Sequence, residues 1–405
     1  MVTSLLVLAI SLAVLIYSSD FLVNSSVRIA RFFKVSTALI GLTIVAFGTS
    51  APELFLSAMA ALGDKGNLSV GNVIGSNIFN LWFILGLAAM VSPILIRRKI
   101  LKRDFTLLMI LTVLMLVMLR NNEVDRRMGI SLLLILVGYT AFLWIKKDVP
   151  EGEIEEAKED LKETKEEDHQ WRNLIIVFVL LSVFAGFTAG GTEEGFGIEW
   201  AYSPFMMWAL IGTAILAAGY FVYSKILYPE KKHRGLFLSF LLLFVSLCTL
   251  IISSDHVVEA AVYLAQLRGM SEWAIGATII AMGTSLPELA VTITSLLKKD
   301  YGLSVGNLIG SDIFNFLGIV GISATITPVH LEPTRLFGEN RGFFAPLGND
   351  IHFSLFLLCL TLILTAIFMR SGRKLSRVEG MILFGIALLR MVFEFNPQFF
   401  VGLFA

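Results

Sequence analysis

The sequence predicts an all-α polytopic membrane protein built from two inverted five-helix repeats, with two additional transmembrane helices between the halves. Composition gives the first observation, because the 405-residue chain is 56% hydrophobic and only 16% charged, with a mean hydropathy of +0.79. The second observation is a hydrophobic stretch that occurs twice, 235 residues apart, with an acid inside both apolar copies. Doubled units that carry an intramembrane acid and helix-breaking Gly and Pro are typical of secondary transporters.

The membrane-spanning segments are predicted from apolar runs of about 20 residues, the length that crosses a bilayer. Short charged segments separate these runs along the chain. We predict twelve spans, at 3–27, 36–62, 69–95, 105–119, 128–145, 173–190, 201–224, 236–264, 272–297, 303–327, 352–369 and 378–395.

The two copies of the repeat align without a gap, residues 41–93 with residues 276–328, and share 26 of 53 positions. Each copy contains G-T-S-x-P-E followed by G-N-x-x-G-S-x-I-F-N. A weaker match continues upstream, where Asp20 aligns with Asp255. We assign no role to these two acids.

The distribution of Lys and Arg predicts the orientation in the membrane, because cytoplasmic loops are richer in these residues. With the N-terminus outside, the inside loops hold 24 of them and the outside loops hold 7. Both termini are therefore predicted to lie on the outer side of the cell membrane. Seven segments separate equivalent helices, an odd number, so the repeats are expected to run in opposite directions around a site near the midplane.

The repeats also define the expected domains. The first repeat covers 1–146, an acidic cytoplasmic linker covers 147–172, two additional helices with a basic loop cover 173–234, and the second repeat covers 235–405. The linker has ten acids between 151 and 168 but no D-x-D-x-D-G calcium-loop pattern. It is either a solvated linker or a regulatory cation sensor.

The G-T-S-x-P-E element brings hard oxygen ligands together. Proline has no N–H, so Pro52 and Pro287 release the carbonyls of Gly48 and Gly283 from helical hydrogen bonds. Such oxygens suit Ca²⁺ or Na⁺ rather than a soft metal. The alternative, a buried Glu that pairs with a base, conflicts with the absence of Lys, Arg and His from these spans. The candidate side-chain ligands are Thr49, Ser50, Glu53, Thr284, Ser285 and Glu288.

The second element adds oxygens at helical spacing. Ser76 and Asn80 are four residues apart and share a helix face, and Ser311 and Asn315 repeat this spacing. The glycines of the element, Gly71, Gly75, Gly306 and Gly310, permit close helix approach or a second helix break. Packing with interhelical hydrogen bonds is the alternative for this element taken alone.

Asp312 stands where the first repeat has Asn77, and it is turned about 100° from Ser311 on a helix. It is either a third carboxylate near the site or an acid that faces a neighbouring helix or a water-filled access path.

These motifs resemble the two α-repeats of the calcium/cation antiporter superfamily, and the G-T-S-x-P-E form resembles its sodium/calcium exchanger branch. The resemblance implies ten core helices, so the sixth and seventh segments look like an insertion. It also implies ion ligands at Thr49, Ser50, Glu53, Ser76, Asn80, Thr284, Ser285, Glu288, Ser311 and Asn315, with help from the backbone carbonyls of Ala46 and Ala281. Many relatives have Asp at the position of Asn315, including potassium-dependent exchangers, which argues against potassium cotransport.

We therefore predict a secondary-active antiporter that exchanges Ca²⁺ for Na⁺ by alternating access, with the first and eighth segments as the moving helices. Two carboxylates match one Ca²⁺ or two Na⁺. The ions are cargo, and no cofactor and no nucleic-acid partner are expected. An H⁺-coupled exchanger of the same fold stays open, because a buried Glu can take up a proton. A cation channel is a more remote alternative. An enzyme is not expected, because all five histidines lie outside the motifs.

Overall fold

The computed structural model describes residues 2–119, 123–146, 231–267, 281–331, 350–370 and 374–395. The chain divides into two compact units, one within residues 1–40 and 147–269 and the other within residues 41–146 and 270–405. The predicted sixth and seventh spans, the acidic linker and the basic loop before residue 231 lie outside the described residues. The domain boundaries expected from the sequence repeats stay a prediction.

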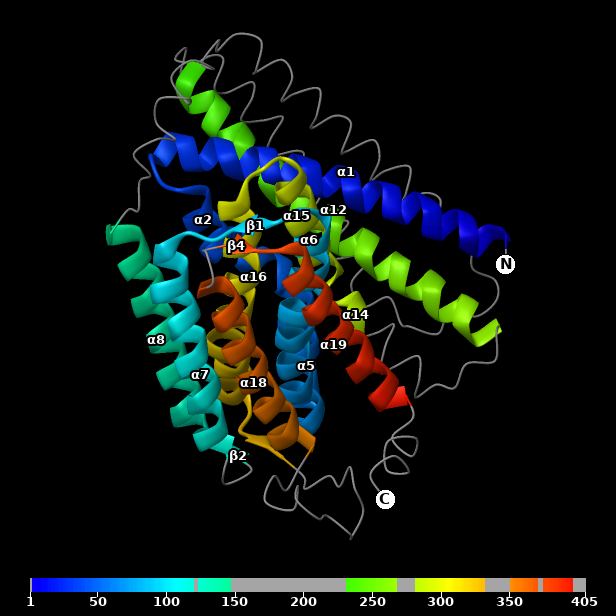
Figure 1. The fold of residues 1–405 in the computed structure, drawn as a ribbon, viewed down its shortest axis with the longest axis vertical. Helices are drawn as coiled ribbons and strands as arrows, with labels where there is room; N and C mark the ends of the chain where they lie inside the picture. The colour runs from blue at the N-terminus through cyan, green and yellow to red at the C-terminus, as the bar shows by residue number, and fades with distance from the viewer. Residues whose placement is uncertain are drawn as a thin grey trace. The chain divides into compact units, whose positions relative to one another are not determined.

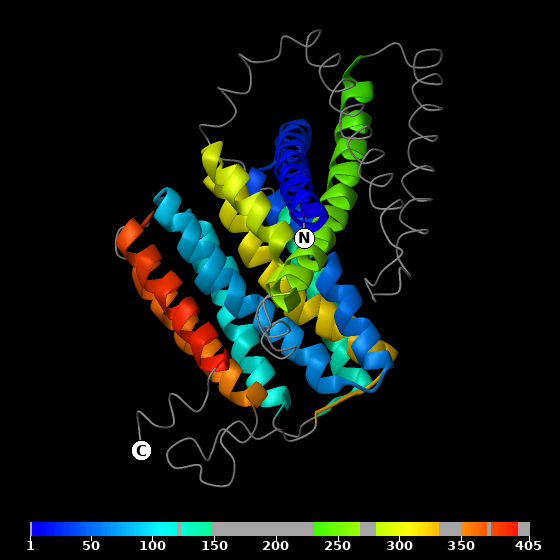
Figure 2. The same ribbon diagram turned by 90° about the vertical axis from the view of Figure 1, so that its right-hand side faces the viewer.

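The first unit contains two long apolar helices. Helix α1 (Val2–Phe33) packs along α12 (Lys231–Leu267), and the short α2 (Thr37–Ile40) follows α1 (Figures 1 and 2). Phe21 of α1 joins Leu241, Val245 and Cys248 of α12 in a buried cluster. Where these side chains would otherwise be exposed to water, their burial stabilises the helix pair by roughly 25 cal/mol per Å² of apolar surface.

The second unit contains both copies of the repeated motifs. Its first half comprises η1 (Gly41–Val45), α3 (Ala46–Thr49), α4 (Ala51–Leu62), α5 (Gly66–Phe79), η2 (Asn80–Ile84), α6 (Leu85–Val91), β1 (Ile94–Leu95), η3 (Ile100–Asp104), α7 (Phe105–Met118), β2 (Glu123–Val124) and α8 (Arg126–Lys146). Its second half comprises α14 (Ala281–Gly283), α15 (Leu286–Leu297), α16 (Tyr301–Phe314), η6 (Asn315–Ile319), α17 (Val320–Ile326), β3 (Val329–His330), α18 (Asp350–Arg370), β4 (Lys374–Leu375) and α19 (Arg377–Phe395). The η elements are π-helical turns.

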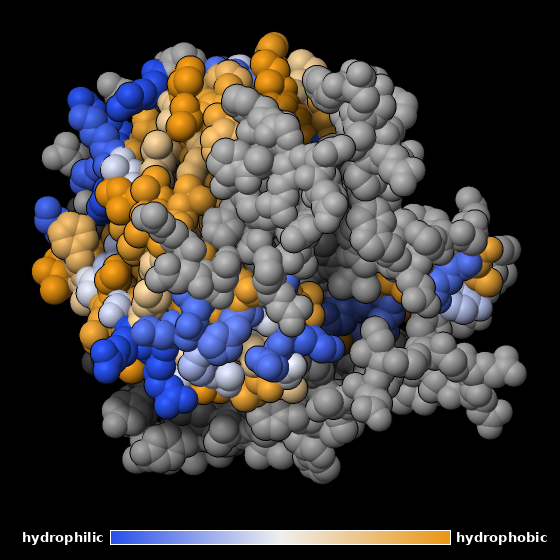
Figure 3. All heavy atoms as spheres, turned by 90° about the horizontal axis from the view of Figure 1, so that it is seen from below, coloured by the Kyte–Doolittle hydropathy of each residue, from blue (hydrophilic) through white to orange (hydrophobic). Residues whose placement is uncertain are grey.

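Helices of the described part are long and apolar enough for a membrane protein. Five of them could cross a bilayer singly, and the bent pair Thr37–Thr49 and Ala51–Leu62 would form a sixth crossing. Apolar side chains such as Ile145, Val137 and Leu134 are exposed on α8, as expected for contact with lipid. Hydrophobic residues also cover large areas of the face shown in Figure 3. The count of twelve spans stays a prediction.

Both copies of G-T-S-x-P-E interrupt a helix. Ser50 (φ −84°, ψ 13°) separates α3 from α4, and Ser285 (φ −92°, ψ 8°) precedes α15. Pro52 and Pro287 lie in the first turn of the following helix, where a missing N–H costs no hydrogen bond. The first break bends the span by 48°. The break therefore places Glu53 and Glu288 in the first turn of α4 and of α15.

The short strands and the last helix of each repeat pack against the other repeat. Strand β1 pairs with β4, and β2 pairs with β3, both antiparallel. The two ribbons lie at opposite ends of α5 and α18 (Figure 1). Helix α8 packs against α17, while α19 packs against α6 (Figures 1 and 2). Each repeat is therefore completed by elements of the other.

Glycine allows close packing at Gly310. A Cβ added at Gly310 of α16 would lie 2.6 Å from Leu42 Cα of η1, so the two backbones touch there. At Gly71 and Gly75 of α5, no other described atom lies within 4 Å of an added Cβ. Close approach stays a prediction for these two glycines, because residues 276–280, the equivalent of η1 in the second repeat, lie outside the described residues. Helix α5 also continues through both of them, and its π-helical turn begins later, at Asn80.

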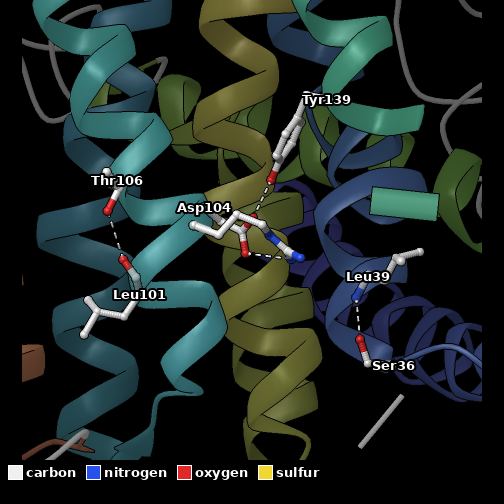
Figure 4. A network of polar contacts seen from close by, with 7 residues as sticks. Ser36, Leu39, Leu101, Asp104, Thr106 and Tyr139 are labelled. Atoms are coloured by element: carbon white, nitrogen blue, oxygen red, sulfur yellow. Dashed lines mark hydrogen bonds and ion pairs between the residues drawn. The ribbon is translucent and has the colours of Figure 1, made fainter. Parts of the chain in front are cut away.

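A buried ion pair fixes the start of α7. Arg103 Nε lies 2.6 Å from Asp104 Oδ1, and the Tyr139 hydroxyl of α8 donates to the same oxygen at 2.9 Å (Figure 4). A buried carboxylate is stable only when it is paired and hydrogen-bonded, and these contacts tie α7 to α8.

Candidate cation site

Two carboxylates form the centre of the candidate site. Glu53 and Glu288 are each 1% exposed, and they lie close enough to repel each other electrostatically. Because the helices that carry them contain no Lys, Arg or His, no basic side chain of the same segments neutralises the pair. Two buried negative charges without a positive partner are costly. The arrangement favours a bound cation.

The serines of the two motifs hold the carboxylates in a reciprocal pattern. Ser50 of the first repeat donates to Glu288 Oε1 at 3.0 Å, and Ser285 of the second repeat donates to Glu53 Oε1 at 3.2 Å. Each carboxylate also accepts from the serine of the second motif in its own repeat. These distances are 3.5 Å from Ser76 to Glu53 and 3.3 Å from Ser311 to Glu288. One site is therefore built from both repeats.

Thr49 connects the first motif to α16. Its hydroxyl lies 3.3 Å from the Ser311 hydroxyl and donates to Asn307 Oδ1 at 3.2 Å. The carbonyl of Ala46 accepts from the Thr49 hydroxyl at 3.4 Å and from the Ser50 N–H at 3.1 Å. This carbonyl thus lies beside the hydroxyls of the site, and its role as an ion ligand stays a prediction.

The corresponding positions of the second repeat lie at the helix break of that repeat. Thr284 is half-buried and lies near the Glu53 carboxylate. Ala281 begins α14, two residues before Gly283. The Gly48 carbonyl, expected to be released by Pro52, is contacted by the N–H of Ser50.

Four polar side chains next to the carboxylates join α5 to α16. Asn80 Nδ2 donates to Asp312 Oδ1 at 2.9 Å, and Asn315 Nδ2 donates to Asn77 Oδ1 at 2.8 Å. Asn77 Nδ2 in turn donates to the backbone carbonyl of Asp312 at 3.2 Å. All four residues are buried, with at most 1% exposure.

Several buried oxygens of this region have no hydrogen-bond partner among the described residues. Buried polar groups are rarely left unpaired, so such atoms need an explanation. Five of them belong to carboxyl or amide groups and act as acceptors, which bind a cation but offer nothing to an anion. They are Glu53 Oε2, Glu288 Oε2, Asn80 Oδ1, Asn315 Oδ1 and Asp312 Oδ2.

The acids alone do not make a metal centre. Within the part of the chain that the structure describes, no three His, Cys, Asp or Glu side chains gather closely enough to hold a metal ion. A cation held here would also need hydroxyl and amide oxygens, which is the chemistry of Ca²⁺ and Na⁺ sites.

Sequence reasoning left three positions unresolved or unassigned. Asp312 is fully buried and bonded to Asn80, so it contacts a neighbouring helix, and its role as a third carboxylate near the site stays a prediction. Asn77 and Asn307 were not singled out, although both form hydrogen bonds with predicted ligands. The signal was present for Asn307, because the G-N pair of the second motif occurs in both copies.

The aligned acids Asp20 and Asp255 belong to the first compact unit. Asp20 of α1 accepts from Asn24 at 3.1 Å, and Asp255 lies on α12 beside His256, which contacts Glu259 at 3.1 Å. Their roles stay unassigned.

A helical membrane protein with a buried carboxylate and hydroxyl site made by two repeats has the features of a cation transporter. The family model described as sodium/calcium exchanger protein matches residues 3–145 and 238–396. The chain belongs to this family.

Individual relatives cover nearly the whole chain. Sodium/calcium exchanger MaX1 of Methanosarcina acetivorans is 30% identical over 392 residues, which cover 96% of this chain and 98% of the relative. Inner membrane protein YrbG of Escherichia coli is 29% identical over 392 residues, with 96% and 97% coverage. A solved structure of the sodium-calcium exchanger NCX_Mj, soaked with 10 mM Na⁺ and zero Ca²⁺, is similar in fold. Its TM-score is 0.65 at 23% identity, and the match covers 96% of this chain and 98% of that one.

Proposed function

We propose that the protein exchanges Ca²⁺ for Na⁺ across the cell membrane, at one site that the two repeats share. The observation that carries this proposal is the reciprocal bonding of Ser50 to Glu288 and of Ser285 to Glu53. It makes the two carboxylates one unit with a charge of −2 when both are ionised. This charge is balanced by one Ca²⁺ or by two Na⁺, so occupancy by one cargo excludes the other.

The ligands of the proposed site are the two carboxylates with the neighbouring hydroxyl, amide and backbone oxygens. The unpaired oxygens of Glu53, Glu288, Asn80 and Asn315 support this assignment, because buried acceptors need a partner and a cation can supply one. The ions are cargo, and we propose no resident cofactor. The proposed ligands are Thr49, Ser50, Glu53, Ser76, Asn80, Thr284, Ser285, Glu288, Ser311 and Asn315, with the carbonyls of Ala46 and Ala281.

Transport by alternating access requires that the site open to each side in turn. We propose that the repeats are inverted, with both termini outside and twelve spans in total. The placement of β1–β4 and β2–β3 at opposite ends of α5 and α18 supports inversion, because β1 and β3 occupy equivalent positions of the two repeats (Figure 1). All the proposed ligands fall in the second compact unit, whereas α1 and α12 belong to the first. This division supports α1 and α12 as the moving helices.

Calcium uptake into proteoliposomes tests the coupling ion. Vesicles loaded with Na⁺ and diluted into Na⁺-free medium should accumulate Ca²⁺ in a saturable manner, and vesicles without an ion gradient should not. Uptake driven by a pH gradient in Na⁺-free vesicles, without any response to added Na⁺, would establish the proton-coupled alternative. A steady, non-saturating Ca²⁺ conductance would instead establish a channel.

A further inference from the structure

Positions 77 and 312 are equivalent in the two repeats, but one is Asn and the other is Asp. In each repeat, an Asn follows this position three residues later. The side chain of that Asn donates a hydrogen bond to the equivalent position of the opposite repeat. Asn80 Nδ2 donates to Asp312 Oδ1 at 2.9 Å, and Asn315 Nδ2 donates to Asn77 Oδ1 at 2.8 Å. Asn80 and Asn315 begin the π-helical turns η2 and η6, a feature that is frequent at functional sites.

The chemistry of the partners fixes the direction of each bond. The Asp312 carboxyl oxygen accepts from the nitrogen of Asn80, so Asn80 Oδ1 points elsewhere. The Asn77 amide donates to the backbone carbonyl of Asp312 at 3.2 Å, and a carbonyl also only accepts. Asn77 Oδ1 must therefore face Asn315, whose own Oδ1 is turned away. Asn80 Oδ1 and Asn315 Oδ1 are buried and have no partner among the described residues.

We propose that Asn77 and Asp312 are positioning residues, which turn the amide oxygens of Asn80 and Asn315 toward the transported cation. This inference rests on the proposed function, because it takes Asn80 and Asn315 as ligands. It adds two residues that act through those ligands.

Two observations favour a positioning role over direct ligation for Asp312. Its Oδ1 is committed to Asn80, and its side chain is turned about 100° from that of Ser311, which donates to Glu288. In addition, no three acids of the described residues gather around one point. Asp312 Oδ2 is unpaired, and a direct ligand would act through this atom. The test must therefore separate the two roles.

A double-mutant cycle between Asp312 and Asn80 makes this separation. Initial rates of Na⁺-driven Ca²⁺ uptake are measured in proteoliposomes over a range of Ca²⁺ concentrations for wild type, Asp312→Leu, Asn80→Ala and the double variant. Leu removes the acceptor and keeps the branched shape of the side chain. Loss of an outer-shell partner typically costs 10–100-fold in metal affinity, so Asp312→Leu should raise the KM for Ca²⁺ by about that factor. Asp312→Asn, which keeps one acceptor oxygen, should recover part of this loss.

The effect of Asp312→Leu in the Asn80→Ala background distinguishes the two roles. If Asp312 acts through Asn80, Asp312→Leu should change the KM by less than about 2-fold once Asn80 is Ala, because coupled residues are not additive. The full penalty in the Asn80→Ala background would overturn the proposal in favour of a direct ligand. An unchanged KM with a lower thermal stability would overturn it in favour of a purely structural contact. Where exchange is too slow to measure, calorimetric titration of the purified variants with Ca²⁺ supplies the same cycle. Absence of exchange in the wild type would instead refute the proposed function.

Discussion

Ser50 donates a hydrogen bond to Glu288 across the repeat boundary at 3.0 Å, and the equivalent bond runs from Ser285 to Glu53 at 3.2 Å. Neither carboxylate is held by its own repeat alone. A movement that separates the two repeats would break both bonds at once. The position of each carboxylate therefore depends on the position of the other repeat. The reciprocal bonds thus link the geometry of the site to the arrangement of the repeats.

Replacement of either glutamate by Gln should stop calcium exchange. Gln keeps the shape and can still accept from Ser285 or Ser50 through its oxygen. It places an NH₂ group where the unpaired Oε2 of Glu53 or Glu288 lies, and it lowers the charge of the site to −1. The fall in Ca²⁺ uptake should exceed the roughly 10–100-fold that loss of an outer-shell partner costs. Proteoliposome uptake measures the effect.

The control for these variants is the folded state itself. Each purified protein should elute as a single species with a melting temperature close to that of the wild type, because only one atom has changed. Wild-type exchange in either Glu53→Gln or Glu288→Gln would remove that residue from the ligand set.

Inversion of the repeats can be tested at two equivalent exposed positions. Leu95 of β1 is 54% exposed, and the side chain of His330 of β3, which occupies the matching position, is 60% exposed. Single cysteines at these positions, with the free Cys248 and Cys359 replaced, should react with an impermeant thiol reagent from opposite sides of the membrane. Position 330 should react in intact cells, and position 95 only after permeabilisation. Labelling of both from one side would rule out inversion.

Packing between η1 and α16 should tolerate no added methyl group. Gly310→Ala would place a Cβ 2.6 Å from Leu42 Cα, and a backbone atom cannot move as a flexible side chain can. Overpacking typically costs about 1–3 kcal/mol, so the melting temperature in detergent should fall. Gly138→Ala, at an exposed position of α8, is the control, because its Cβ would meet no other described atom within 4 Å. Equal melting temperatures for the two variants would contradict the close contact.

The candidate site was predictable from the sequence because its residues are repeated. Glu53 and Glu288 stand out as acids in apolar segments, and the repeated Pro indicates the helix break that presents them. The partners of these acids follow from tertiary contacts that no local pattern contains. Alignment pairs Ser50 with Ser285, but it does not indicate that each serine contacts the glutamate of the other repeat.

Other features needed the structure for physical reasons. Glycine is small wherever it occurs, so the motif cannot tell that Gly310 touches the backbone of η1. The π-helical turns at Asn80 and Asn315 break the period of the helix by one residue, and the apolar pattern around them hides this change. Asp312 could be placed on a helix by periodicity, but its partner Asn80 lies on another segment.

Removal of the two serine hydroxyls should separate sodium from proton coupling. A proton requires only a carboxylate, whereas Na⁺ requires several neutral oxygens around it. In the double variant Ser50→Ala and Ser285→Ala, Glu288 and Glu53 each lose their cross-repeat donor, and the site loses two oxygens. A Na⁺-coupled exchanger should then need at least about 10-fold more Na⁺ for half-maximal Ca²⁺ uptake. The buried Ser295→Ala is the matched control, because that hydroxyl donates to backbone carbonyls of its own helix. It should leave the dependence on Na⁺ unchanged. Unaltered Na⁺ dependence in the double variant would remove the hydroxyls from the sodium site, and retained proton-driven flux would favour the proton-coupled exchanger.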